Sequence, residues 1–130
     1  MPKLVRVAVL TKYLEVTQDL GLNPRDVLAV AGLNKAQLQS PDYRIPIDAA
    51  VRLLEDSAAA SGCQTFGLRM AESRQLSDFG VVSLLLSQQR TLRDALQVME
   101  RYRHLMNDSL GIFVEEAGRM VIIRAEMVTE

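Results

Sequence analysis

Few residues of this 130-residue chain are of the types that perform catalysis. The chain has one histidine, His104, and one cysteine, Cys63, so histidine catalysis would have to use His104 with Ser109 or Cys63 as the nucleophile. A single cysteine cannot form an internal disulfide, and no pair of cysteines or histidines is available to hold a metal. His104 is expected near the end of a long helix, where a cationic side chain interacts favourably with the helix dipole. We therefore expect no catalytic residue, no metal site and no cofactor.

Carboxylates and glycines give no stronger indication of an enzyme. Adjacent carboxylates occur at Glu55/Asp56 and at Glu115/Glu116, but sequence neighbours point in different directions on a helix or a strand. The glycines are dispersed, so no glycine-rich phosphate loop is present. Cys63 follows a helix-terminating glycine, where the pKa of a thiol can fall, but we interpret it as a structural cysteine. The residues favour a protein that is not an enzyme.

Arginines offer a different kind of chemistry. A basic cluster surrounds one predicted helix and comprises Arg90, Arg93, Arg101, Arg103 and His104. Such a cluster forms either a solvated helix face or a site for a carboxylate or phosphate, which guanidinium groups grip in a bidentate manner. The six methionines either fill the core or line an adaptable pocket.

Composition sets the class of protein. The chain is 48% hydrophobic and 24% charged, as expected for one packed domain rather than a disordered tail. The formal net charge of −1 provides no general attraction for nucleic acid or an anionic membrane. The most apolar stretch, residues 79–86, is far shorter than the ~20 residues of a membrane span. The amino-terminal residues do not form a secretory signal. We expect a cytoplasmic protein without a membrane partner.

Helical periodicity covers most of the chain. It predicts helices over residues 4–20, 24–31, 35–39, 47–61, 65–73, 79–88 and 92–106. Asn23, Asn34, Asp78 and Thr91 are the predicted amino-terminal caps, and Gly62 is a predicted stop. Residues 40–46 are predicted to be an extended connector.

The pattern changes from a period of 3.6 to a period of 2 after Asn107. Residues 110–115 and 120–126 are β-branched runs separated by a glycine-containing connector, which predicts a hairpin. An isolated two-stranded hairpin is marginal in water, so either the helices cover it or it belongs to a larger sheet that continues beyond this chain, and we favour the larger sheet. The predicted fold class is α+β, with a helical amino-terminal part followed by an antiparallel β-hairpin.

Residues 25–38 superficially match a helix-turn-helix motif. The second helix would end at Pro41 after barely two turns, which is short for a helix that lies in a major groove. Its polar residues are few, and Leu28 is large for the tight crossing of two helices. We therefore do not expect this segment to bind DNA.

Several ordered blocks carry a resemblance to a known family. They are residues 44–47 (Arg-Ile-Pro-Ile), 66–72 (Phe-Gly-Leu-Arg-Met-Ala-Glu), 76–80 (Leu-Ser-Asp-Phe-Gly), 91–96 (Thr-Leu-Arg-Asp-Ala-Leu), Tyr102 and 107–108 (Asn-Asp). Together they resemble the amino-terminal effector domain, termed arabinose-binding-like, of AraC/XylS-type bacterial transcriptional regulators. The similarity is to the branch common among ornithine-utilisation-type regulators.

The resemblance implies a sensor domain over residues 1–130, and a carboxy-terminal DNA-binding domain that is absent from this chain. A small-molecule effector, of a class that the sequence does not name, would shift the presentation of that DNA-binding domain. A homodimer is also implied, and DNA would be contacted only through the absent domain. The alternative is an interaction module that self-associates through residues 81–86 or the hairpin edge, without any small molecule.

Candidate effector-binding residues follow from the chemistry of the segments around the predicted helices. Apolar walls are expected from Phe79, Met99, Tyr102 and Met106, with Arg103 or His104 holding a polar end of the ligand. Arg69 and Glu72 are three apart on a helix, so they form either a structural ion pair or a contact to the ligand.

Overall fold

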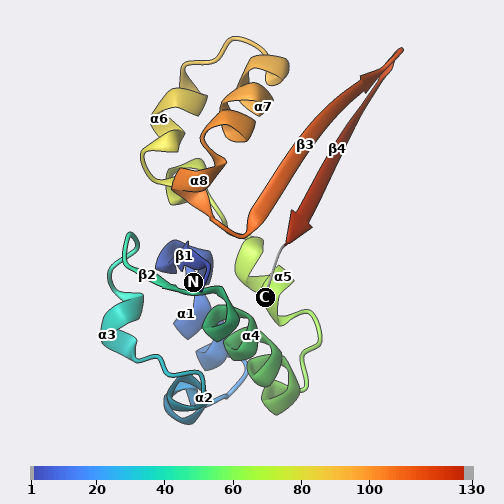
Figure 1. The fold of residues 1–130 in the computed structure, drawn as a ribbon. Coiled ribbons are helices and arrows are strands. Elements are labelled where there is room, and N and C mark those ends of the chain that lie inside the picture. Colours follow the sequence, from blue (N-terminus) through green and yellow to red (C-terminus); the bar gives the residue numbers. More distant parts are fainter. Residues whose placement is uncertain (1, 128–130) are drawn as a thin grey trace.

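The computed structural model describes residues 2–127. These residues form two lobes, which lie one above the other in Figure 1. We call residues 2–75 the helical lobe and residues 76–127 the hairpin lobe. The helical lobe contains β1 (Leu4–Arg6), the 3-10 helix η1 (Val7–Leu10), α1 (Tyr13–Asp19), α2 (Pro24–Val30), α3 (Lys35–Leu38), β2 (Arg44–Pro46), α4 (Ile47–Ser61) and α5 (Phe66–Ala71). The hairpin lobe contains the 3-10 helix η2 (Leu76–Phe79), α6 (Val82–Ser87), α7 (Leu92–Arg101), α8 (Arg103–Met106), β3 (Leu110–Ala117) and β4 (Met120–Met127).

The predicted α+β class is confirmed, and local signals placed several helices correctly. Asn23 caps α2 by accepting the Arg25 amide at 3.1 Å, and Asn34 caps α3 in a reciprocal capping box. Gly62 ends α4 in the left-handed conformation, with φ of 71°. These signals act within one helical turn, so they do not depend on the rest of the fold.

The predicted helix over residues 4–20 is wrong in its first half. Residues 4–6 form β1, which pairs antiparallel with β2 and sets Val5 opposite Ile45. Both side chains are fully buried, so pairing with a distant strand stabilises an extended conformation that periodicity alone did not indicate. Lys12, with φ of 72°, separates the 3-10 turn η1 from helix α1. The predicted connector over residues 40–46 therefore includes a strand.

Two further helix predictions need correction. The helix predicted over residues 79–88 begins only at Val82, because Gly80 has a positive φ of 69° that interrupts it. Asp78 therefore does not cap α6; its carboxylate accepts the Gln75 amide at 2.8 Å and closes η2 instead. The helix predicted over residues 92–106 is broken at Tyr102 into α7 and α8. Its predicted cap is confirmed, since Thr91 Oγ1 accepts the Asp94 amide at 3.1 Å.

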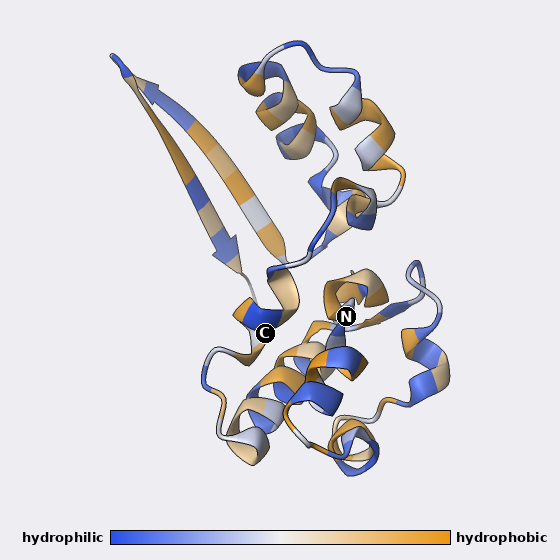
Figure 2. Ribbon diagram, turned by 180° about the vertical axis from the view of Figure 1, so that it is seen from behind, coloured by the Kyte–Doolittle hydropathy of each residue, from blue (hydrophilic) through white to orange (hydrophobic). Residues whose placement is uncertain are grey.

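The main hydrophobic core lies within the helical lobe, between α1, α2, α4, α5 and the β1–β2 pair. Tyr13 and Phe66 lie at its centre, with ring centroids 5.6 Å apart and ring planes inclined at 49°. Hydrophobic and hydrophilic residues occupy different sides of these helices (Figure 2). Burial of the apolar sides holds the lobe together, because most of these helices are too short to be stable alone.

The hairpin lobe is less enclosed. Strands β3 and β4 pair antiparallel, with Val114 opposite Ile123, and extend away from the body of the molecule (Figure 1). Helix α7 packs against β3, whereas every residue of β4 is exposed. The predicted hairpin is confirmed. Its membership of a larger sheet stays a prediction.

Candidate functional site

Arg6 connects the two lobes from the end of β1. Its Nε and Nη2 atoms donate to Asp42 Oδ1 at 3.0 and 2.7 Å, and its Nη1 atom donates to the Asp78 carbonyl oxygen at 3.0 Å. The Arg6 side chain is only 10% exposed, although the Asp42 side chain is 87% exposed. A buried guanidinium needs such partners, because an unpaired buried charge is costly. Arg6 thus ties strand β1 to the 3-10 helix η2.

Gly80 is required by this arrangement. A Cβ atom at residue 80 would lie 2.7 Å from Arg6 Nη2, and the φ of 69° is one that side-chain-bearing residues rarely adopt. The absence of a side chain lets the backbone approach the guanidinium closely. The chain can therefore turn from η2 into α6 directly over Arg6.

A second arginine, Arg44, also connects the lobes, whereas Arg74 joins two parts of the helical lobe. Arg74 Nη1 and Nη2 donate to the carbonyl oxygens of Ala8 and Val9 at 3.1 and 2.9 Å. Arg44 Nη1 forms an ion pair with Asp108 Oδ2 at 3.2 Å.

Backbone groups add to this junction. The Asp108 amide donates to the Leu4 carbonyl at 3.3 Å, and an isolated β-bridge joins Val5 to Asn107. The polar contacts between the lobes are therefore numerous, whereas the main apolar core lies within the helical lobe alone.

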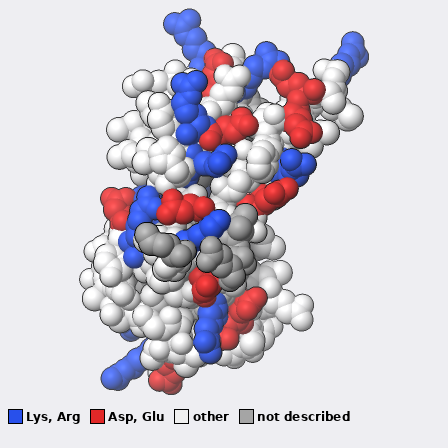
Figure 3. Space-filling model, viewed as in Figure 1, with Lys and Arg blue, Asp and Glu red and all other residues white. Residues whose placement is uncertain are grey.

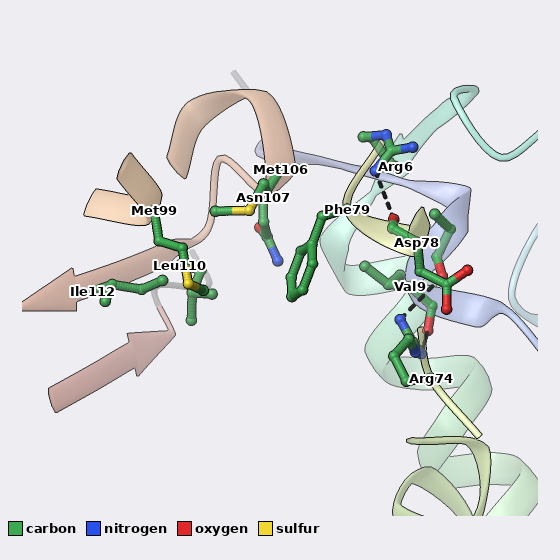
Figure 4. A pocket seen from close by; sticks show the side chains of 11 residues that line it. Arg6, Val9, Arg74, Asp78, Phe79, Met99, Met106, Asn107, Leu110 and Ile112 are labelled. Carbon is green, nitrogen blue, oxygen red and sulfur yellow. Dashed lines mark hydrogen bonds between the residues drawn. The ribbon is translucent and has the colours of Figure 1, made fainter. Parts of the chain in front are cut away.

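A cavity of about 130 Å³ lies at this junction. Figure 4 shows apolar side chains from the hairpin lobe on one side of it, and polar side chains and backbone of the helical lobe and η2 on the other. The lining residues are Arg6, Ala8, Val9, Arg74, Asp78, Phe79, Met99, Met106, Asn107, Leu110 and Ile112. The hairpin lobe thus supplies the large apolar side chains of the lining, whereas the helical lobe supplies both of its arginines.

The structure brings three of the predicted site residues together at this cavity. Phe79, Met99 and Met106 line it, although they come from η2, α7 and α8. Tyr102 lies between α7 and α8 and does not line the cavity. Arg103 and His104 are exposed on α8, also away from its lining.

Arg69 and Glu72 lie at the end of α5, exposed and outside the cavity lining. Among the described residues no ion pair joins these two side chains, so the predicted structural pair is not formed. An exposed pair gains little from contact in water, which explains why spacing alone does not produce one. Arg69 instead lies near Cys63. The pKa of the Cys63 thiol is lowered mainly by a hydrogen bond with Thr65 and, to a smaller extent, by Arg69.

The sequence-based selection missed the polar part of the cavity. Arg6, Arg74 and Asn107 were not selected, although the first interrupts an apolar run of the sequence. A charged residue inside a run of buried residues is a signal that it has a specific partner. That signal identifies Arg6 as unusual, but it does not reveal which residues it meets.

The remaining candidates for chemistry are dispersed over the structure. Glu116 forms an ion pair with Arg93 at 2.6 Å, while Glu115 lies near Arg124 at 3.8 Å, so the adjacent carboxylates engage different partners. Within residues 2–127 no group of three or more histidine, cysteine or carboxylate side chains is placed to hold a metal ion. In the same part of the chain no helix has the length and apolar character to cross a membrane.

Charge on the surface is mixed. Figure 3 shows basic side chains interspersed with acidic ones over the visible face, rather than gathered into a continuous basic surface. Helix α3 spans four residues, or about 6 Å at 1.5 Å per residue, which is short for reading a major groove. These features support the interpretation that residues 25–38 are not a DNA-reading motif.

Comparison of the sequence with known proteins identifies its relatives. Residues 21–129 match the family described as the arabinose-binding domain of AraC transcription regulators, N-terminal. The chain is 29% identical over 111 residues to the HTH-type transcriptional regulator VirS of Mycobacterium tuberculosis, in strains CDC 1551 / Oshkosh and ATCC 25618 / H37Rv. The alignment covers 85% of this chain and 33% of VirS, so the chain spans about a third of the length of these relatives. Since the family match covers most of the sequence, this chain belongs to the family of N-terminal arabinose-binding domains of AraC transcription regulators.

Proposed function

We propose that this chain is the effector-sensing and dimerising domain of an AraC-type transcriptional regulator that acts in the cytoplasm. In this proposal the effector binds in the junction cavity and alters how the two lobes are arranged. The change then biases the presentation of a helix-turn-helix domain in the longer protein. The observation that carries the proposal is that one cavity is lined by residues of both lobes, including Arg6 and Ile112.

The physical basis is a shift of populations. A ligand held between two lobes favours the arrangement in which both walls contact it. The shift cannot exceed the difference between the affinities of the ligand for the two arrangements. The junction suits such a shift because it is held largely by hydrogen bonds and ion pairs, such as Arg44–Asp108, which is partly exposed. Contacts of this kind contribute little individually and can exchange with water.

No chemical step is part of the proposal. DNA contact is assigned to the carboxy-terminal part of the longer protein, because the short helix α3 and the mixed surface charge of this chain do not suit a DNA-binding motif.

Thermal unfolding with a panel of candidate effectors tests the sensing function. A ligand that binds only the folded state raises stability by RT ln(1 + [L]/Kd), which is about 2.7 kcal/mol at 100 times Kd. We expect saturable stabilisation by one chemical class. A variant in which Leu110→Phe fills the cavity should lose the response, whereas Leu84→Phe, at an exposed position of α6, should keep it. Stabilisation that persists unchanged in the Leu110→Phe variant would place the effector elsewhere.

Exposed apolar side chains favour a second candidate, a module for self-association without a ligand. Val81 and Leu84 near and on α6 are 68% and 67% exposed, and Val121 and Ile123 on β4 are about half exposed. Sedimentation at several concentrations separates the two functions. A concentration-dependent dimer combined with no response to any effector would favour the second candidate.

A further inference from the structure

The apolar wall of the junction cavity limits the chemistry of its occupant. Phe79, Met99, Met106, Leu110 and Ile112 supply hydrocarbon and thioether surface and no strong hydrogen-bonding group. A hydroxyl placed against this wall would lose its hydrogen bonds to water without replacement, at substantial cost. The two methionines can adjust to different shapes of an apolar group. The wall therefore suits a hydrocarbon and disfavours a pentose, whose hydroxyls cover every side.

The polar wall is rich in donors. A guanidinium carries five N–H groups. Arg74 uses one each on Nη1 and Nη2 for the carbonyls of Ala8 and Val9, and Arg6 uses three for Asp42 and Asp78. Both guanidiniums therefore retain N–H groups beyond those used for protein acceptors. These N–H groups are available to donate hydrogen bonds to an acceptor atom of a ligand.

Asn107 adds a further donor. Its Oδ1 atom accepts a hydrogen bond from the Ser109 amide at 2.7 Å, which fixes the orientation of the Asn107 side chain. The NH2 group of the same side chain is not used in that hydrogen bond. Figure 4 shows this amide nitrogen on the Phe79 side of the cavity.

The balance of charge along the lining favours a single negative charge. Arg6 and Arg74 contribute two cations and Asp78 contributes one anion. One Asp78 oxygen, Oδ2, already accepts the Gln75 amide. Asp42 partly offsets Arg6, but it does not line the cavity and extends into solvent. A monoanion would leave the lining near neutrality, whereas an ammonium group would add to its positive charge.

The size of the cavity limits the apolar part of the ligand. A cavity of about 150 Å³ lined by aliphatic and aromatic side chains accommodates benzene, a molecule of about six carbons. The junction cavity has about 130 Å³. Its occupant should therefore carry an apolar body of about four to six carbons.

From these features we infer that the effector is a small monocarboxylate with a compact hydrocarbon body, its carboxylate held by Arg74 and Arg6 and its body against the methionine wall. This inference rests on the proposed sensing function and names the ligand class of the same site. The family takes its name from arabinose binding, but the lining of this cavity fits an organic acid rather than a sugar.

The test uses the full 130-residue chain and five probes of related size. The probes are hexanoate, its uncharged methyl ester, hexylamine, the dicarboxylate adipate and L-arabinose, each titrated by calorimetry and thermal unfolding. We expect saturable binding of hexanoate, and at least tenfold weaker binding of the other four. Adipate should fail because its second carboxylate would meet the apolar wall.

Variants locate the carboxylate. Arg74→Gln should weaken hexanoate binding at least tenfold while the far-ultraviolet circular dichroism stays native, because Arg74 is exposed and its side chain is not part of the hydrophobic core. Arg52→Gln is the matched control, since Arg52 lies on the exposed side of α4 and does not line the cavity. The control should bind hexanoate as the parent does.

Each outcome is decisive. Equal binding of hexanoate and its ester, or unchanged binding by Arg74→Gln, would overturn the carboxylate assignment. If hexylamine, arabinose or another compound of a wider panel stabilises the chain instead, the inference fails while the sensing function stands. If neither the probes nor the wider panel stabilises the chain, the sensing function fails as well.

Discussion

The hydroxyl groups of Tyr13 and Ser57 lie 2.7 Å apart inside the core of the helical lobe. Both residues are almost completely buried, and Tyr13 also packs against Phe66. A buried hydroxyl that loses its hydrogen-bond partner destabilises the folded state, because its lost hydration is not replaced. This pair therefore holds α1 and α4 in one relative position as well as filling space.

We expect Tyr13→Phe to lower the free energy of unfolding by about 1–2 kcal/mol, because the Ser57 hydroxyl is then left without a partner. Chemical denaturation measures the change. The double variant Tyr13→Phe/Ser57→Ala should be less destabilised than the sum of the two single variants, since it removes both hydroxyls together. Strict additivity would show that the hydrogen bond contributes nothing.

The same tyrosine predicts an alkaline dependence of stability. Burial raises the pKa of Tyr13 above its ordinary value of 10, while the hydrogen bond with Ser57 acts in the opposite direction. Above about pH 10 an unfolded tyrosine loses its proton while the folded one retains it, so the folded state binds more protons. The contribution of Tyr13 to stability should therefore be constant below about pH 10. It should fall as the pH rises from there toward the pKa of Tyr13 in the folded state. Tyr13→Phe should reduce that fall, measured by denaturation at several pH values.

Gly80 and Gly67 provide a matched pair of glycine substitutions. At Gly80 the positive φ and the contact with Arg6 make Gly80→Ala costly, by about 1–3 kcal/mol for the backbone conformation alone. Gly67 lies within α5, with open space where a Cβ would be placed. Gly67→Ala should raise stability by about 0.5–1 kcal/mol, because alanine is the better helix former. Similar effects of both substitutions on the denaturation midpoint would contradict the role given to Gly80.

At the scale of elements, capping decides where α7 begins. Thr91 Oγ1 accepts the Asp94 amide at 3.1 Å, and α7 carries both a wall residue of the cavity, Met99, and the contact with β3. We expect Thr91→Ala to cost about 1 kcal/mol of stability, and Thr91→Ser to be nearly neutral because it keeps the cap. Thermal unfolding of both variants checks this. An equal loss in both would mean that the threonine methyl group, rather than the cap, is important.

Element boundaries were predictable where the signal is local. The caps Asn23, Asn34 and Thr91 indicated three helix starts correctly, since each acts on an amide two or three residues away. The break at Tyr102 was not predictable, because the apolar period continues through it. Strand β1 was missed for the same kind of reason: its partner β2 lies about 40 residues away in the sequence.

For the molecule as a whole, stability should differ between the lobes. Leu53 in α4 is fully buried in the core, whereas all of β4 is exposed and pairs on one edge only within the described residues. Amides that open locally exchange faster than those released only by global unfolding. We expect hydrogen exchange to be slowest in α4 and fastest in the outward-facing amides of β4, measured by mass spectrometry. Equal protection in the two elements would indicate that the hairpin is stabilised by contacts beyond those described.

The sequence by itself determined the α+β class, most of the helices, the hairpin and three of the apolar residues that line the cavity. These depend on hydrophobic periodicity and on caps, which operate over one or two turns of chain. Phe79, Met99 and Met106 were identified in this way. The polar wall was decided only by the tertiary structure. Arg6 meets the Asp78 carbonyl across 72 residues, and Arg74 meets those of Ala8 and Val9 across 66 and 65. A hydrogen bond to a backbone carbonyl does not depend on the side chain of the acceptor residue, so only the tertiary packing could reveal these contacts.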